Sequence, residues 1–393
     1  MYMRPGITIQ HSRERADDMD VVRSDIAGFI GVIRADYWPD TARVGDFVEL
    51  PLENYGDFEQ SRFAKVFDPA SARAVRSFFE NGGVRCHLFG VYLKSLKDLM
   101  AREPLRGTFF ALMERLTGQE DLGILAMPIL AHLPHHIEGT SVTFSGEPIL
   151  EMLLKHCRMM NNRFLVIDAP KDLHDEHLVH WVERFQSLHE GAVSYGALYY
   201  PWLMSGEEHF APSGAVAGVF ARTELASNPF GVRQPPANKR VRGVTHPYVD
   251  VSWSDADRFL GAHINLLMVQ PAQGIVVWGA RTLSTDRRWV HINSRRIISL
   301  VAEQLRRDNE WVIFENQRPQ LWELVARSAR TRLDALWSAG LLTGEQAGLD
   351  YVVQCDSETN PVAVRDAGEL HVKVTLRPIS TTEYIVVDLR LGN

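Results

Sequence analysis

The sequence lacks most of the features that identify secreted proteins, membrane proteins and nucleic-acid-binding proteins. Only 3 of its 393 residues are cysteines, and Cys86, Cys157 and Cys355 lie far apart, so we expect reduced thiols and no disulfide framework. No run of about 18 apolar residues occurs, so no membrane span is expected. The first residues do not resemble a secretory signal, and the formal net charge of −7 argues against a chain-wide basic surface for nucleic acid.

Catalytic motifs are also missing. There is no Gly-x-Ser-x-Gly elbow, no glycine-rich phosphate loop followed by Lys-Ser/Thr, and no His-Glu-x-x-His. Two histidine groups have spacings only partly compatible with metal binding. A solvated helix start explains the first group more simply, and a surface loop explains the second. The first group is His174, His177 and His180, and the second is His132, His135 and His136. We predict no catalytic residue, metal or cofactor. The weaker alternative is an α/β enzyme with its site at a strand end such as Asp168.

A chain of this length exceeds one hydrophobic core, so two or three domains are expected. Between residues 21 and 250, predicted helices alternate with apolar strands. The helices cover 69–80, 148–160 and 176–189, and the strands cover 84–92, 164–167 and 193–200. This alternation predicts an α/β domain with a mostly parallel sheet covered on both faces.

The last third follows a different pattern. Prolines, glycine and asparagines between 227 and 250 mark a long connection, so we place a domain boundary near residue 250. Beyond it we expect helices over 254–265, 295–307 and 319–339, and strands over 274–280, 311–314, 351–355, 369–376 and 383–391. Three helices mixed with several strands, without the regular alternation of the first part, predict an α+β domain over 251–376.

The two ends of the chain carry strand-like segments without obvious local partners. Near the start they are Gly6, Ile7, Thr8, Ile9 and Gln10, followed by a polar stretch over 12–20. Near the end they are Tyr384, Ile385, Val386, Val387 and Leu389. An unpaired strand leaves backbone donors and acceptors open. Pairing within the chain at a sheet edge, and addition to a neighbouring subunit's sheet, would both satisfy them, and the residues leave both open.

Arginines concentrate in one part of the sequence. Residues 281–340 contain eleven arginines, no lysine and seven acidic residues, whereas residues 341–393 have four basic and eight acidic residues. Six of the arginines form three adjacent pairs: Arg287 and Arg288, Arg295 and Arg296, and Arg306 and Arg307. They indicate either a solvated helix face or an interface with an acidic protein surface.

One run of residues resembles a known family. Residues 277–283 read Val-Trp-Gly-Ala-Arg-Thr-Leu, and Asp286, Trp289 and the Ile-Asn-Ser-Arg-Arg run at 292–296 follow. This order resembles the contractile tail sheath family of myophage tails, R-type pyocins and extracellular contractile injection systems. Further similarities extend over nearly the whole chain, including Pro5-Gly6-Ile7 and Phe314-Glu315-Asn316.

The resemblance implies a structural subunit. Such subunits stack as hexameric rings around an inner tube and contract to drive that tube through a target envelope. It also implies a donor arm and linker over 1–20, an outer domain over 21–250, an inner tube-facing domain over 251–376, and a donor strand over 377–393. Both donor segments would complete the C-terminal domain of a neighbour, with flexing at 12–20 and at the turn Arg377–Pro378.

The expected partners are copies of the chain itself, the inner tube, and baseplate and terminator or cap proteins, without nucleic acid or membrane insertion. We expect assembly in the bacterial cytoplasm, with possible release as a phage tail-like particle. Arg327 and Arg330, on the basic long helix, are the hypothesised tube-facing contact. A minor sheath paralogue at the baseplate or cap end is the nearer alternative to the bulk sheath subunit.

Overall fold

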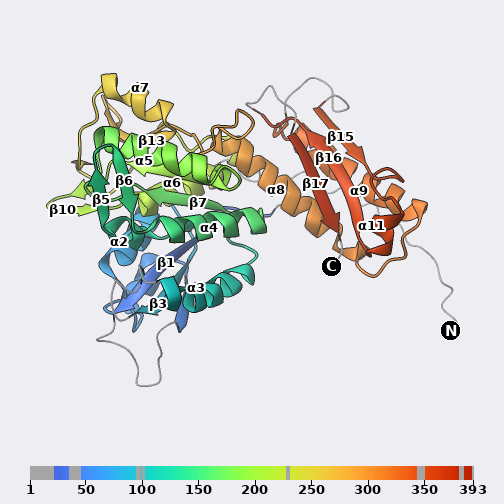
Figure 1. The fold of residues 1–393 in the computed structure, drawn as a ribbon, viewed down its shortest axis with the longest axis horizontal. Helices are drawn as coiled ribbons and strands as arrows, with labels where there is room; N and C mark the ends of the chain where they lie inside the picture. The colour runs from blue at the N-terminus through green and yellow to red at the C-terminus, as the bar shows by residue number, and fades with distance from the viewer. Residues whose placement is uncertain are drawn as a thin grey trace.

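The protein folds into a large α/β body and a smaller C-terminal body, joined by the helix α8, Ile292–Asp308 (Figure 1). The computed structural model describes residues 22–34, 46–93, 99, 102–226, 231–342, 350–379 and 385–391. In that part of the chain no helix combines the length and apolar character needed to cross a bilayer, and all three cysteines are free.

A nine-stranded sheet forms the centre of the large body, in the order β11-β14-β13-β8-β7-β4-β1-β3-β2. Neighbouring strands from β3 through β13 run parallel, whereas β2, β14 and β11 join antiparallel at the two sides. The bounds are β1 Ala27–Arg34, β2 Phe47–Leu52, β3 Cys86–Leu93, β4 Ile124–Ala126, β7 Phe164–Asp168, β8 Gly196–Tyr200, β11 Lys239–Arg240, β13 Ile264–Gln270 and β14 Gly274–Trp278. The predicted mostly parallel sheet is therefore confirmed.

Helices cover both faces of this sheet because successive strand residues point to opposite sides. In β1, Phe29 and Ile33 face one core, whereas Ile30 and Val32 face the other. The first core includes α1 Tyr55–Gln60, α2 Pro69–Glu80 and α6 Ser213–Leu225. The second includes α3 Arg102–Thr117, α4 Glu147–Met160, α5 Asp175–Leu188 and α7 Trp253–Gly261. The prediction for α2 was correct to the residue, since the Asp68 carboxylate accepts from the Ser71 amide and Pro69 occupies the first turn.

Short strands add two surface elements to the large body. β5 His135–Glu138 and β6 Ser141–Phe144 form a hairpin, and β9 Leu203–Ser205, β10 Glu208–Phe210 and β12 His246–Pro247 form a small sheet.

The C-terminal body packs two helices against a three-stranded antiparallel sheet. The sheet contains β15 Tyr351–Gln354, β16 Leu370–Leu376 and β17 Ile385–Leu391, with β16 in the centre. The long helix α9, Pro319–Ser338, and the second half of α8 supply the other side of the core, and α11, Val362–Asp366, lies before β16. Leu321, Val325, Ala329, Leu333 and Leu336 of α9 form the buried stripe that the spacing predicts.

The predicted domain boundary near residue 250 is wrong. β13 and β14 belong to the large sheet, and Leu283 still lies in one of its cores. The core of the C-terminal body takes its residues from Ile297 onward, together with Val22 and Val232. The predicted helix over 254–265 ends at Gly261, because His263 adopts a left-handed backbone and Ile264 begins β13. The predicted strand over 311–314 is also wrong, since Glu310–Val312 form a 3₁₀ turn, η7.

Candidate assembly site

The sheet of the C-terminal body has two outer edges. β15 and β17 each pair only with β16 within the described residues, so each has one side with no strand beside it. Such an edge presents unpaired N–H and C=O groups that can bind an additional strand. Within the described residues, the C-terminal body therefore has two sheet edges at which a further strand has room to pair.

The predicted donor segments are only partly visible. Gly6, Ile7, Thr8, Ile9, Gln10 and Tyr384 lie outside the described residues. Ile385, Val386, Val387 and Leu389 lie in β17, which pairs with β16 of the same chain from Leu370–Leu391 to Leu376–Ile385. The isolated chain thus adopts the intramolecular pairing, and exchange between copies stays a prediction.

The turn Arg377–Pro378, where we expected flexing, is fixed by backbone contacts. The Arg377 amide donates to the Asp350 carbonyl at 2.8 Å, and the Ile379 amide donates to the Leu341 carbonyl at 2.9 Å. Because both bonds anchor the segment that leaves β16, this turn is part of the C-terminal body rather than a hinge.

The hypothesised tube-facing arginines both lie on the exposed side of α9. Arg327 Nη2 lies 3.2 Å from Glu323 Oε1, with both side chains 69% exposed, and Arg330 Nη2 donates to the Val353 carbonyl at 3.3 Å. An exposed pair of this kind contributes only about 0–1 kcal/mol. Arg327 is therefore available to a partner at little cost to folding, whereas Arg330 also contacts β15.

Exposed apolar side chains follow α8. Trp311 is 47% exposed, Ile313 is 52% exposed and Phe314 is fully exposed. Phe314 also has a φ of +74°, a conformation that residues with a Cβ rarely adopt. Exposed clusters of large apolar residues are typical of interaction surfaces.

The run at 277–283 forms the turn between the large sheet and α8. The buried Asn265 side chain accepts from the Arg281 amide at 2.8 Å and donates to the Arg281 and Leu198 carbonyls at 2.7 and 3.1 Å. Gly279 has a φ of +127°, and a Cβ there would lie 2.8 Å from Asn265 Oδ1. The glycine is thus required both by its backbone conformation and by the close approach of Asn265.

The arginine pair that follows this turn is buried, which neither sequence interpretation predicted. The Arg295 guanidinium lies between the Tyr195 and Trp289 rings, 4.3 and 4.2 Å from their centres. Burial lowers its pKa. Arg296 Nη2 lies 2.7 Å from Glu224 Oε2. A helix pattern cannot reveal these contacts, because the partners come from three other segments of the chain.

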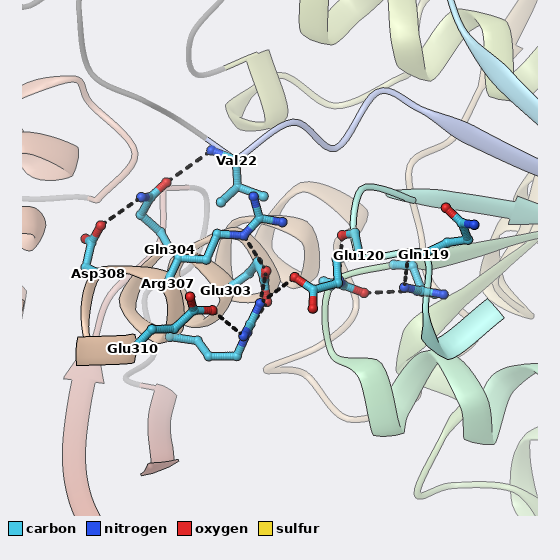
Figure 2. A network of polar contacts seen from close by, with 11 residues as sticks. Val22, Gln119, Glu120, Glu303, Gln304, Arg307, Asp308 and Glu310 are labelled. Atoms are coloured by element: carbon cyan, nitrogen blue, oxygen red, sulfur yellow. Dashed lines mark hydrogen bonds and ion pairs between the residues drawn. The ribbon is translucent and has the colours of Figure 1, made fainter. Parts of the chain in front are cut away.

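The third arginine pair also connects the two bodies. Glu303 of α8 accepts from Arg306 and Arg307, and Arg306 extends to Glu310 at 2.7 Å and to Glu120 of the large body at 3.1 Å (Figure 2). Figure 2 also shows the Val22 amide bonded to Gln304, whose side-chain amide reaches Asp308. α8 therefore makes polar contacts with the large body over most of its length.

The enzyme alternative finds little support at Asp168. Its carboxylate is buried and accepts from the Ser213 amide at 2.6 Å, an arrangement that holds the start of α6. Burial raises the pKa of Asp168 to about 7. The adjoining cavity measures about 10 Å³, which is room for a single water at most. Asp168 therefore has a structural partner and no space beside it for a substrate.

Three of the six histidines, from both groups, have ordinary partners. His174 Nδ1 lies 3.1 Å from the Tyr200 hydroxyl, and His177 Nε2 lies 3.2 Å from the Gly139 carbonyl. His132 packs on Trp202, and burial lowers its pKa to about 4. Across the described ranges, no three His, Cys, Asp or Glu side chains are grouped so as to hold a metal ion.

Comparisons with known proteins converge on one family. Residues 149–283 match the family model described as phage tail sheath protein central domain. The chain is 22% identical over 262 residues to a prophage major tail sheath protein of Pseudomonas aeruginosa (strain UCBPP-PA14), which covers 66% of this chain and 63% of that protein. It is 25% identical over 180 residues to the tail sheath protein of Vibrio phage KVP40, covering 45% of this chain and 26% of the relative. The matches thus span less than two thirds of these relatives' lengths.

Solved structures extend the likeness to the whole fold. The contracted helical sheath of the anti-feeding prophage is 21% identical with a TM-score of 0.69, covering 98% of this chain and 99% of that one. The contracted sheath complex of an extracellular contractile injection system, PVC, is 22% identical with a TM-score of 0.68, covering 98% and 97%. A chain of the anti-feeding prophage baseplate also has a TM-score of 0.68, at 21% identity and 98% coverage of both. The resemblance to the contractile tail sheath family is confirmed.

Proposed function

We propose that this chain is a structural subunit of a contractile tail sheath. Its copies polymerise as stacked hexameric rings around an inner tube and contract to drive the tube through a target envelope. The observation that carries the proposal is a fold that matches sheath chains along nearly their full length, combined with a C-terminal sheet that has two open edges.

Strand exchange would connect the copies. An N-terminal arm over residues 1–20 and the strand of the expected donor segment 377–393, beyond the turn that Arg377 and Ile379 anchor, would each add to the C-terminal body of a neighbour. Exchange of this kind is heterologous, so it produces rings and helical polymers rather than closed dimers. The exposed side chains of Trp311, Ile313 and Phe314 on the same body support a role in self-assembly.

The inner tube would contact the exposed side of α9 through Arg327 and Arg330. Sheath and tube must separate during contraction, and exposed charge pairs are weak enough to break. Baseplate and terminator or cap proteins would contact the terminal rings. The role is structural, without catalysis or a cofactor, and assembly would occur in the bacterial cytoplasm before any release of the particle.

The likeness to a baseplate chain supports a second candidate, a minor sheath paralogue at one end of the particle. Electron microscopy of the chain with its tube protein separates the two candidates. A bulk subunit forms long cylinders, whereas an end-ring paralogue is confined to one end of the particle.

The experiment that tests strand exchange is a disulfide staple within the C-terminal sheet. Lys373 and Asp388 lie opposite each other on β16 and β17, within the reach of a disulfide between cross-strand neighbours. In a Cys355→Ser background, Lys373→Cys with Asp388→Cys would lock β17 onto its own chain when oxidised. We expect the oxidised form to stay small on size exclusion and the reduced form to build polymers.

The matched control staples two strands that exchange leaves together. Val352 on β15 lies opposite Thr375 on β16, so Val352→Cys with Thr375→Cys should polymerise in both redox states. If the oxidised β16–β17 staple polymerises as well as its reduced form, donation of the C-terminal strand is refuted.

A further inference from the structure

The chain enters the described structure at a site where several elements meet. The Val22 amide donates to Gln304 Oε1 of α8 at 3.1 Å. Two residues later, the Ser24 amide donates to Glu224 Oε1 of α6 at 3.1 Å, and the Ser24 hydroxyl also contacts this oxygen. Arg296 Nη2 donates to the Ser24 carbonyl at 2.9 Å. The backbone is thus held on both sides of Arg23 before β1 begins at Ala27.

Burial makes this site stronger than an ordinary surface contact. Ser24, Glu224 and Arg296 are 8%, 9% and 7% exposed. Glu224 and Arg296 form a close ion pair, with Arg296 Nη2 2.7 Å from Glu224 Oε2, and the guanidinium lies 5.2 Å from the centre of the Phe220 ring. Hydrogen bonds to charged groups are about twice as strong as neutral ones. The three segments involved are separated by 200 and 72 residues of sequence.

We propose that Ser24, Glu224 and Arg296 anchor the N-terminal arm, so that force on the arm passes directly into α8 and the large body. The proposal rests on the proposed sheath function, in which a neighbour holds the arm. A pull on residues 1–21 would load the Val22 and Ser24 bonds together, before it reaches β1, an interior strand of the large sheet. The anchor residues position the arm; they do not bind a neighbour themselves.

A purely structural role would give a different pattern of effects. If this ion pair only stabilised the fold, its loss would raise the population of opened states throughout the chain. If it anchors the arm, its loss would raise the population of states in which the segment around residue 23 is open, before other segments open. A local measurement therefore separates the two roles.

Trypsin provides that measurement, because Arg23 precedes Ser24. The Arg23 side chain is 48% exposed and pairs with Asp25, but cleavage of the Arg23–Ser24 bond requires the Ser24 backbone to leave Glu224 and Arg296. Under native conditions the cleavage rate reports the population of this open state. Mass spectrometry identifies the product by its new N-terminus at Ser24.

In the full-length chain, we expect Glu224→Gln to raise the rate of cleavage after Arg23 about tenfold or more, because a charged acceptor is lost from a buried site. The milder Ser24→Ala, which removes only the hydroxyl, should raise it less. The matched control is Glu147→Gln, which breaks a half-buried ion pair with Arg184 between α4 and α5. It should leave cleavage after Arg23 unchanged.

Equal acceleration by Glu224→Gln and Glu147→Gln would overturn the anchor, and so would no acceleration by Glu224→Gln or Ser24→Ala. Electron microscopy then tests its role in assembly. We expect Glu224→Gln to shorten or abolish polymers while Glu147→Gln keeps them, and normal polymers of Glu224→Gln would refute transmission of force through this site. Failure of the unmodified chain to polymerise would count against the proposed sheath function instead.

Discussion

Asn265 offers the sharpest test of how the large sheet is connected to α8. Its side chain is fully buried and makes three hydrogen bonds, two with the backbone of Arg281 and one with the Leu198 carbonyl. Asn265→Ala removes all three and leaves backbone groups of the turn without these partners. The turn that carries Gly279 would then lose the side chain against which it is folded.

The expected loss of stability follows from the number of bonds. At a net value of about 1 kcal/mol for each hydrogen bond, three bonds give about 3 kcal/mol. Any buried group that finds no replacement adds a desolvation cost of about 1–3 kcal/mol. We therefore expect Asn265→Ala to lower the free energy of unfolding by at least about 3 kcal/mol, which is large for one substitution.

Urea unfolding followed by tryptophan fluorescence measures this change, since the partly buried Trp278 immediately precedes Gly279. The control is Asn316→Ala, at an exposed asparagine, where we expect a change within about 0.5 kcal/mol. A loss below about 1 kcal/mol for Asn265→Ala, at an unchanged denaturant dependence, would show that the turn does not depend on this side chain.

Two further predictions concern charge. Reversal of both α9 arginines, Arg327→Glu with Arg330→Glu, should abolish tube binding in a co-sedimentation assay, and the exposed Arg287→Glu is the control. Sheath polymers should still form, because Arg327 loses only an exposed pair with Glu323 and Arg330 loses only one long hydrogen bond, 3.3 Å, to the Val353 carbonyl. Unchanged tube binding would contradict the assignment. Burial lowers the pKa of His156 to about 4, below its unfolded value of about 6.5. The unfolded chain therefore binds the extra proton first. The contribution of His156 to stability, on the order of 3 kcal/mol, is present above pH 6.5 and lost as the pH falls towards 4. His156→Gln should flatten this part of the stability curve, and an unaltered acid slope would show that His156 does not cause it.

Local signals in the sequence predicted the regular elements well. Asp68, Pro69 and the glycines after Asn81 define both ends of α2, and the apolar stripe of α9 predicted its buried face. The prediction failed at residues 264 and 265, which we assigned to a helix and which begin the strand β13. The apolar run that forms β13 directly follows α7, and only the left-handed turn at His263 separates them.

Long-range contacts explain the remaining errors. The boundary near residue 250 followed a proline-rich connection, but β13 pairs with β8, which lies on the other side of that connection. Arg295 and Arg296 resembled surface residues because their partners, among them Tyr195, Glu224 and Ser24, are distant in sequence. No periodicity within a helix can indicate that an arginine will be buried against such partners.

The sequence by itself determined the secondary structure of the central helices, the α/β order of the large body and the resemblance carried by the run at 277–283. These depend on residues close together in the chain, where capping, periodicity and glycine conformation act. Only the tertiary structure decided that this run forms a turn hydrogen-bonded to Asn265, that α8 contacts both bodies, and that the Glu224–Arg296 ion pair binds the backbone of Ser24. Those features arise from contacts between segments far apart in sequence, whose free energy exists only once the whole chain has folded.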